Sequence, residues 1–212
     1  NIDYDAKGQR QRIDYGNGTS TTYTYDEEIY QLRRLFTERN QTTNQSQTKL
    51  KENSLQDLSY VYDAVGNITS IRDDAHQAHF FNNAKIEPHT EYCYDSTYRL
   101  IQAEGRAQYR TNPIDNIPSH KQPEIPKTPI DGNAMQRYRE LYVYDEVGNF
   151  LSTIHKDLRA QNPTGWTREY FYHEPSLMDD DARKGFVSNR LSATKVNNIT
   201  ENYAYDTHGS MQ

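Results

Sequence analysis

The chain has 212 residues and a net charge of −6, and only 33% of its residues are hydrophobic, with a mean hydropathy of −1.09. This apolar fraction excludes a large dry core, whereas the 12% of aromatic residues argues against a disordered chain. The acidic balance and the lack of a basic run give no support for nucleic-acid binding, and neither a signal peptide nor an apolar run of membrane length is found.

One short motif recurs along the chain and accounts for most of its 18 tyrosines. Tyr-x-Tyr-Asp is complete five times, and Ile2–Asp5 and Tyr170–His173 look like altered copies. A glycine follows three residues after the aspartate in some copies, but Ile29 and Tyr98 take its place in two others. The structural positions expected from the five complete copies are Tyr23, Tyr25, Asp26, Tyr60, Tyr62, Asp63, Gly66, Tyr92, Tyr94, Asp95, Tyr142, Tyr144, Asp145, Gly148, Tyr203, Tyr205, Asp206 and Gly209.

The first part of the chain holds two of these units. Gly16-Asn17-Gly18 is a strong turn signal between Ile13–Tyr15 and Thr21–Tyr25, which predicts a β-hairpin. Residues 39–53 are polar and rich in Gln and Asn, which is typical of a long surface loop between strands.

The central unit begins at Tyr60 and shows what the motif predicts. Tyr60 and Tyr62 have the period-2 spacing of a strand, Asp63 suits the first position of a type I turn, and Gly66 suits the positive φ of a G1 bulge. Residues 67–71 then return as the partner strand. Ile68 and Ile71 are three residues apart, so either a bulge separates them or both faces of the strand are partly buried. We expect the tyrosines to cover the sheet and to leave their hydroxyls in water.

The middle of the chain carries another hairpin, an insertion and a long strand. The hairpin starts at Tyr92, and residues 138–144 alternate in the manner of a strand. Between them, residues 111–133 hold five of the eight prolines, which disfavour both helix and central strand. We therefore interpret 111–133 as a Pro-rich insertion loop, because the repeat resumes beyond it.

The last part of the chain is again predicted to be mainly strands. The region around Trp166 is strand-like, and residues 189–194 and 199–205 form further strands. Residues 176–184 are either a short helix, with Ser176 as N-cap and Gly185 after its end, or a loop.

The repeat Tyr-x-Tyr-Asp-x-x-Gly-Asn-Ile resembles the motif of the Rhs, or YD-repeat, proteins. Longer runs at residues 55–75, 94–106 and 131–135 are similar to the Rhs region of the B component of bacterial insecticidal toxin complexes (Tc toxins). This resemblance covers essentially the whole chain. It implies an all-β fold of repeated antiparallel β-hairpins that forms part of a large curved hollow shell.

The resemblance also implies partners. In this family the B and C components together enclose the toxic C-terminal segment of C, and the shell sits on a pore-forming A component that delivers the toxin. We recognise neither the β-propeller that docks the shell nor the conserved segment that cleaves the toxin from its carrier, so contact with A would use other regions. We expect residues 1–212 to be one YD-repeat segment of a larger, secreted protein, with no nucleic-acid or membrane contact of its own.

Other functions have less support in the residues. The repeat aspartates lie on separate hairpins, and His76 and His79 would face opposite ways on a strand. Asp179–Asp181 lacks the pattern of a calcium loop, and Cys93 has no cysteine partner. We therefore predict no catalytic, cofactor-binding or metal-binding residue and no enzymatic activity. The alternative to a shell segment is a secreted or surface adhesin that binds carbohydrate or protein partners through exposed tyrosine rows.

Overall fold

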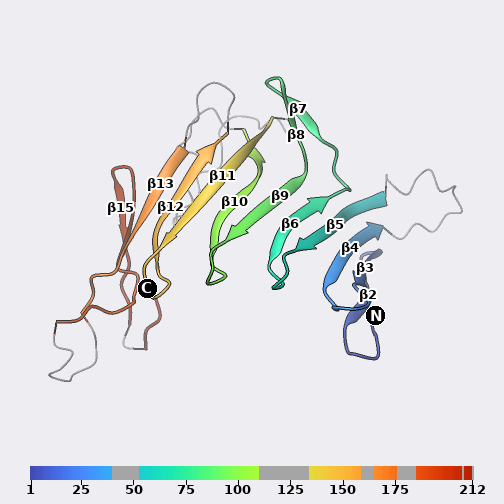
Figure 1. Ribbon diagram of the computed structural model, residues 1–212, viewed down its shortest axis with the longest axis horizontal. Helices are drawn as coiled ribbons and strands as arrows, with labels where there is room; N and C mark the ends of the chain where they lie inside the picture. The colour runs from blue at the N-terminus through green and yellow to red at the C-terminus, as the bar shows by residue number, and fades with distance from the viewer. Residues whose placement is uncertain (40–52, 110–133, 159–164, 176–184, 207, 212) are drawn as a thin grey trace, which may run out of the picture.

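The computed structural model describes residues 1–39, 53–109, 134–158, 165–175, 185–206 and 208–211. Within these residues, 13 strands form one antiparallel sheet whose strand order follows the chain, and a two-stranded hairpin is inserted between β6 and β9. Figure 1 shows the sheet as a curved band of strands lying side by side. The predicted all-β fold of repeated hairpins is confirmed. The insertion at 111–133, the helix or loop at 176–184 and all but the two end residues of the expected loop at 39–53 lie outside the described residues.

The strands are short, as expected for a chain punctuated by turns. Those of the large sheet are β1 (Ile2–Tyr4), β2 (Arg10–Asp14), β3 (Thr19–Tyr25), β4 (Leu32–Arg39), β5 (Ser54–Tyr62), β6 (Ile68–Asp73), β9 (His89–Tyr94), β10 (Leu100–Gln108), β11 (Met135–Tyr144), β12 (Phe150–Asp157), β13 (Gly165–Phe171), β14 (Ala193–Val196) and β15 (Ile199–Asn202). The separate hairpin consists of β7 (His79–Phe81) and β8 (Ala84–Ile86). The turns that join β5 to β6, β9 to β10 and β11 to β12 lie along one edge of the sheet, the lower edge in Figure 1.

A bulge in the return strand resolves the spacing of the two isoleucines. Tyr60 is opposite Ile71 and Tyr62 is opposite Ile68, with a register shift that leaves Thr69 unpaired. Both isoleucines therefore lie on the face of the two tyrosines, as the bulge interpretation requires. The same register shift occurs in four other hairpins, after β1, β3, β9 and β11, so the bulge belongs to the repeat.

Two regions differ from the sequence-based expectation. The β7–β8 hairpin was not predicted, although Asn82-Asn83 between two apolar stretches is a type I′ turn signal, and both residues have positive φ values of 48° and 60°. Near the C-terminus the strands are shorter than expected, because β14 begins only at Ala193. The Ser192 side chain accepts hydrogen bonds from the backbone N–H groups of His173 and Glu174, so Ser192 is held outside the strand by its side chain.

The described residues contain little buried apolar surface. The buried hydrophobic residues are Ile86, Ala103, Ala134, Trp166, Ala193 and Val196, and three of these six are alanines. Buried polar residues are at least as prominent, Asp157 and Ser20 being the most completely buried side chains. A hairpin of this sheet therefore depends on the strands beside it more than on a hydrophobic core of its own.

Candidate functional site

The aspartate of each repeat is a turn former. Asp63 Oδ1 accepts hydrogen bonds from the backbone N–H groups of Val65 (3.0 Å) and Asn67 (2.8 Å), and its Oδ2 accepts one from Asn67 Nδ2 (2.9 Å). Gly66 closes the turn with a φ of 97° and donates its N–H to the Asp63 carbonyl. The bond from the Asn67 side chain, together with the backbone N–H groups, lowers the pKa of Asp63. The carboxylate is thus used within its own hairpin.

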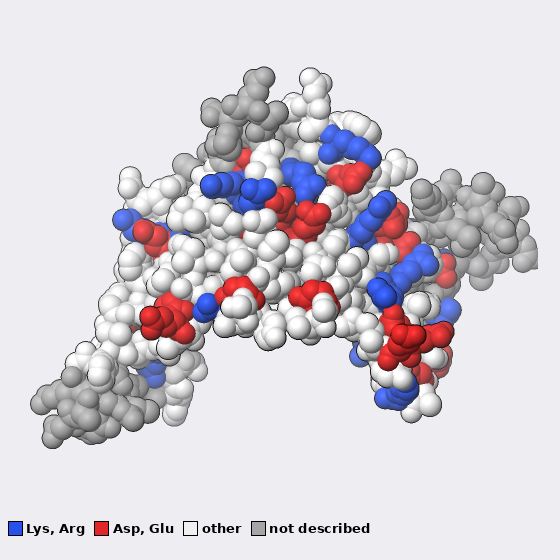
Figure 2. All heavy atoms as spheres, viewed as in Figure 1, with Lys and Arg blue, Asp and Glu red and all other residues white. Residues whose placement is uncertain are grey.

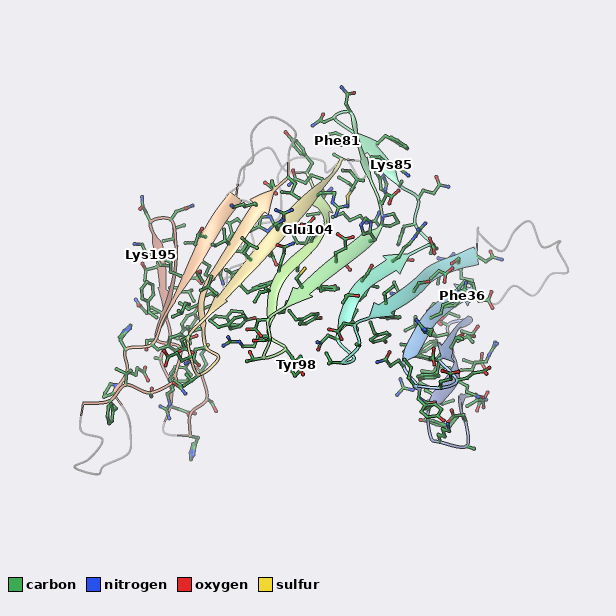
Figure 3. All side chains as sticks on the ribbon, viewed as in Figure 1. Phe36, Phe81, Lys85, Tyr98, Glu104 and Lys195 are labelled. Carbon is green, nitrogen blue, oxygen red and sulfur yellow. The ribbon has the colours of Figure 1, made fainter. Side chains whose placement is uncertain are left out.

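The turns without glycine keep a left-handed residue. Tyr98 has a φ of 65° and donates its N–H to Asp95, whose pKa is held far below its usual range mainly by the backbone N–H of Arg99. After Asp26 the turn is one residue longer, because Tyr30, with a φ of 59°, takes the left-handed position in place of Ile29. The exposed Tyr98 marks the turn edge of the sheet in Figure 3.

The second tyrosine of four repeats bonds to the backbone of a neighbouring segment instead of leaving its hydroxyl in water. In each case the hydroxyl donates to a backbone carbonyl, and we call this contact the inter-hairpin bond. The pairs are Tyr62 with Leu32 (2.7 Å), Tyr94 with Ile68 (2.8 Å), Tyr144 with Leu100 (2.8 Å) and Tyr205 with Leu191 (2.9 Å). Burial raises the pKa of the phenols of Tyr62, Tyr94 and Tyr144. The first three bonds each connect a hairpin to the one before it.

The two faces of the sheet differ in character. One row across β9, β10, β11 and β12 consists of Glu91, Glu104, Arg139 and Lys156, and we call this side the charged face. Glu104 accepts from Arg139 Nε at 2.6 Å. Figure 2 shows acidic and basic side chains beside one another over the middle of the sheet, and Figure 3 places Glu104 there. This face is a set of paired charges that link adjacent strands.

The opposite side, which we call the aromatic face, carries the repeat tyrosines and a buried polar cluster. The next row across the sheet is Tyr92, Ala103, Glu140, His155 and Trp166, each opposite its neighbour. His155 Nδ1 lies 3.0 Å from Glu140 Oε1, and His155 Nε2 lies 3.3 Å from Asp157 Oδ1. The ring of a buried histidine is therefore held between two carboxylates.

Two further contacts fix this cluster. Gln136 Nε2 donates to Asp157 Oδ1 at 2.6 Å, and the Tyr142 hydroxyl donates to Glu140 Oε2 at 2.6 Å. The His155 ring is stacked between Tyr138 and Trp166, with centroid distances of 5.2 Å on both sides. We call Gln136, Tyr138, Glu140, His155, Asp157 and Trp166 the histidine cluster.

Sequence reasoning did not find the histidine cluster. It placed Tyr138 and Glu140 on one face of a strand, but it assigned no role to His155 or Asp157. The available signal was the alternation of Thr153, His155 and Asp157, which puts polar groups on one side of a strand. The register that sets Glu140 opposite His155 depends on the whole hairpin, so the alternation alone could not reveal the pairing.

The other residues weighed in the sequence do not come together. His76 lies in the turn after β6, 3.6 Å from Asp73, whereas His79 begins β7. Cys93 is exposed on β9, and Asp179–Asp181 lies outside the described residues. Among the described residues, no group of three His, Cys, Asp or Glu side chains has the arrangement of a metal site. The same part of the chain contains no helix long and apolar enough to cross a membrane.

Curated relatives identify the kind of protein to which the chain is similar. No family model matches it. Two proteins of Yersinia entomophaga, Toxin subunit YenC1 and Toxin subunit YenC2, are 36% and 38% identical to it over 161 and 162 residues. These matches cover 76% of this chain but only 15% and 16% of the relatives, so the chain spans a small part of their length.

Solved structures of toxin complexes have the same fold. The chain matches part of the crystal structure of TcdB2-TccC3-Cdc42 with a TM-score of 0.60 and 29% identity, covering 100% of this chain and 10% of that one. The structure of the Photorhabdus luminescens Tc holotoxin pore matches with a TM-score of 0.59 and 29% identity, covering 100% of this chain and 9% of that one. These matches confirm the expected Rhs region. The chain belongs to the Rhs, or YD-repeat, family and is similar to the Rhs region of toxin-complex subunits.

Proposed function

We propose that this segment is a length of wall in an Rhs shell that encloses a cytotoxic protein segment and helps to deliver it. The observation that carries this proposal is the continuous antiparallel sheet, in which successive hairpins pair with one another and have little core of their own. A sheet of this kind extends by adding hairpins, which suits a wall. Similarity to TcdB2-TccC3 complexes over the full length of the chain supports the same function.

The role that follows is structural rather than enzymatic. The carboxylates of Asp63, Asp95 and Asp145 accept hydrogen bonds from their own turns, on separate hairpins. The carboxylates of the histidine cluster are likewise occupied by His155, Gln136 and Tyr142. The named relatives are toxin subunits, which favours a shell segment over an adhesin.

The partners follow from the shell. The segment would close together with another Rhs-shell subunit, the C component, around that subunit's toxic segment. Contact with the pore-forming A component would use regions outside residues 1–212, and the full-length protein would be secreted with the complex. The narrower assignment to a B component stays a prediction, since the curated relatives are named YenC1 and YenC2.

Limited proteolysis of the full-length protein, assembled with its partner subunit, tests the enclosure. A closed wall excludes a protease, so the toxic segment should be digested much more slowly in the assembly than in the isolated partner. The control is the same assembly opened by a low concentration of urea, in which the toxic segment should regain its sensitivity. Equal digestion rates in the closed assembly and the isolated partner would show that the wall does not enclose it.

A further inference from the structure

The histidine cluster requires a charged imidazole. Both ring nitrogens of His155 face a carboxylate oxygen, Nδ1 that of Glu140 and Nε2 that of Asp157. A neutral imidazole has one N–H and one lone pair, so it could donate to only one of these carboxylates and would present its lone pair to the other. Only the protonated ring donates to both at once. The geometry therefore favours the cation in the folded wall.

The groups around His155 offer no substitute for this charge. From β11, the titratable side chains that face the ring are Glu140, Tyr138 and Tyr142. From its own strand, Asp157 faces it, and from β13 the uncharged Trp166 is stacked on it. Arg168 lies two residues along the same face of β13 but is opposite Thr153, not His155.

We propose that the histidine cluster makes the packing of β11, β12 and β13 sensitive to pH, and we call these three strands the seam of the wall. The strands stay together near neutral pH and separate more readily at alkaline pH. When His155 loses its proton, one carboxylate keeps only its bond from Gln136 or Tyr142, and the two carboxylates face each other across an uncharged ring. Asp157 is buried and Glu140 is partly buried, so an uncompensated charge at this site is costly. The pairing of β12 with β11 through His155 and Glu140 is then weakened, beside the Trp166 ring of β13 that is stacked on His155.

The sign of the pH dependence follows from the pKa of His155. Burial lowers this pKa, but the hydrogen bonds to Glu140 and Asp157 outweigh burial and raise it above the ordinary value of 6.5. A raised folded pKa gives stability that is complete below about 6.5 and is lost as the pH rises through the folded pKa. Between the two values, the opening constant of the strands should rise by up to about tenfold for each pH unit.

Amide hydrogen exchange on the full-length protein with its partner subunit measures this opening. Peptides from β11–β13 are compared with peptides from β3–β5 in the same molecule at pH 6, 7, 8 and 9, after correction for intrinsic exchange rates. We expect the protection of β11–β13 relative to β3–β5 to fall progressively above about pH 7. A constant ratio from pH 6 to 9 would overturn the proposal, and this result needs no variant.

Two variants assign the effect to the cluster. Glu140→Gln removes one carboxylate, so neutral His155 can donate to Asp157 and accept from the amide; the fall in protection should disappear or move to lower pH. His89→Gln is the matched control, because His89 also lies near two glutamates, Glu87 (3.9 Å) and Glu91 (3.6 Å), but outside the cluster. Its profile should match that of the unmodified protein. A fall that persists in Glu140→Gln, or vanishes in His89→Gln, counts against the proposal.

The pH sensitivity of the seam does not depend on whether the wall encloses a toxic segment. A role for the seam in releasing that segment does rest on the proposed enclosure. If the enclosed segment also becomes protease-sensitive over the same pH interval, alkaline loosening opens the wall. A pH-dependent fall in protection together with a toxic segment that is digested equally fast in the assembly and in the isolated partner would support the seam and refute the enclosure.

Discussion

At the scale of single residues, the residue with positive φ in each turn is the feature that the neighbouring sequence encodes most directly. Glycine there was predictable, because the type I turn and its bulge are set by neighbouring residues alone. What the sequence could not show is that Tyr98 holds the same conformation, at an expected cost of about 1–2 kcal/mol. The bonds of Asp95 to Thr97 and Arg99 offset that cost, and they form only once the turn exists.

A pair of glycine substitutions tests this backbone requirement. Gly148 has a φ of 98° and a Cβ there would meet nothing within 4 Å, so Gly148→Ala should destabilise its hairpin by about 1–2 kcal/mol through backbone strain alone. Gly16 is equally open but lacks positive φ, and Gly16→Ala should be neutral or stabilising by about 0.4–1 kcal/mol. Local unfolding free energies from hydrogen exchange measure both. Equal losses at the two positions would refute the turn assignment.

At the scale of elements, the inter-hairpin bond explains why the second tyrosine of the motif differs from the first. The ladders between hairpins begin at Arg34, Ser70 and Gln102, each two residues after a carbonyl that receives a tyrosine hydroxyl. The repeat bulge lies in this interval and takes that carbonyl out of the ladder. The hydroxyl therefore satisfies an acceptor that the backbone leaves open.

Removing one tyrosine hydroxyl should weaken the contact between two neighbouring hairpins. Tyr144→Phe keeps the ring but leaves the Leu100 carbonyl without its donor, which should cost about 0.5–1.5 kcal/mol and should raise hydrogen exchange at the start of β10 and the end of β11. Tyr98→Phe is the control, since Tyr98 is exposed and its hydroxyl has no hydrogen bond within the described residues. If the two variants behave alike, the inter-hairpin bond contributes nothing to the wall.

The hairpins themselves were predictable because their turns are encoded by adjacent residues. The place of β7 and β8 outside the sheet was not, because it depends on β6 pairing with β9 across them. The histidine cluster was hidden for a similar reason, since its members come from three strands whose registers are set by all the hairpins together. Local chemistry thus reveals the units but not the contacts made between them.

At the scale of the whole molecule, the outer strands of the sheet determine the solubility and self-association that we expect. β1 and β15 end the strand order, so each has one row of backbone donors and acceptors without a strand beside it in the described sheet. With so little buried apolar surface, residues 1–212 produced alone should associate through these strands or be poorly soluble. Sedimentation velocity measures this. A stable monomer at all concentrations would mean that the segment does not need its neighbours.

The inter-hairpin bond also bears on how such walls change over generations. Two of these hairpins, those of Tyr62 and Tyr94, carry the tyrosine that joins them to the hairpin before and also present the carbonyl that receives the next tyrosine. A duplicated hairpin would therefore already carry both the tyrosine and the carbonyl that its inter-hairpin bonds need. A gain or loss of a few residues would instead break one of these bonds. Gene duplication and deletion in whole hairpins should thus be the tolerated route by which a wall becomes longer or shorter, and by which it fits a cargo of another size.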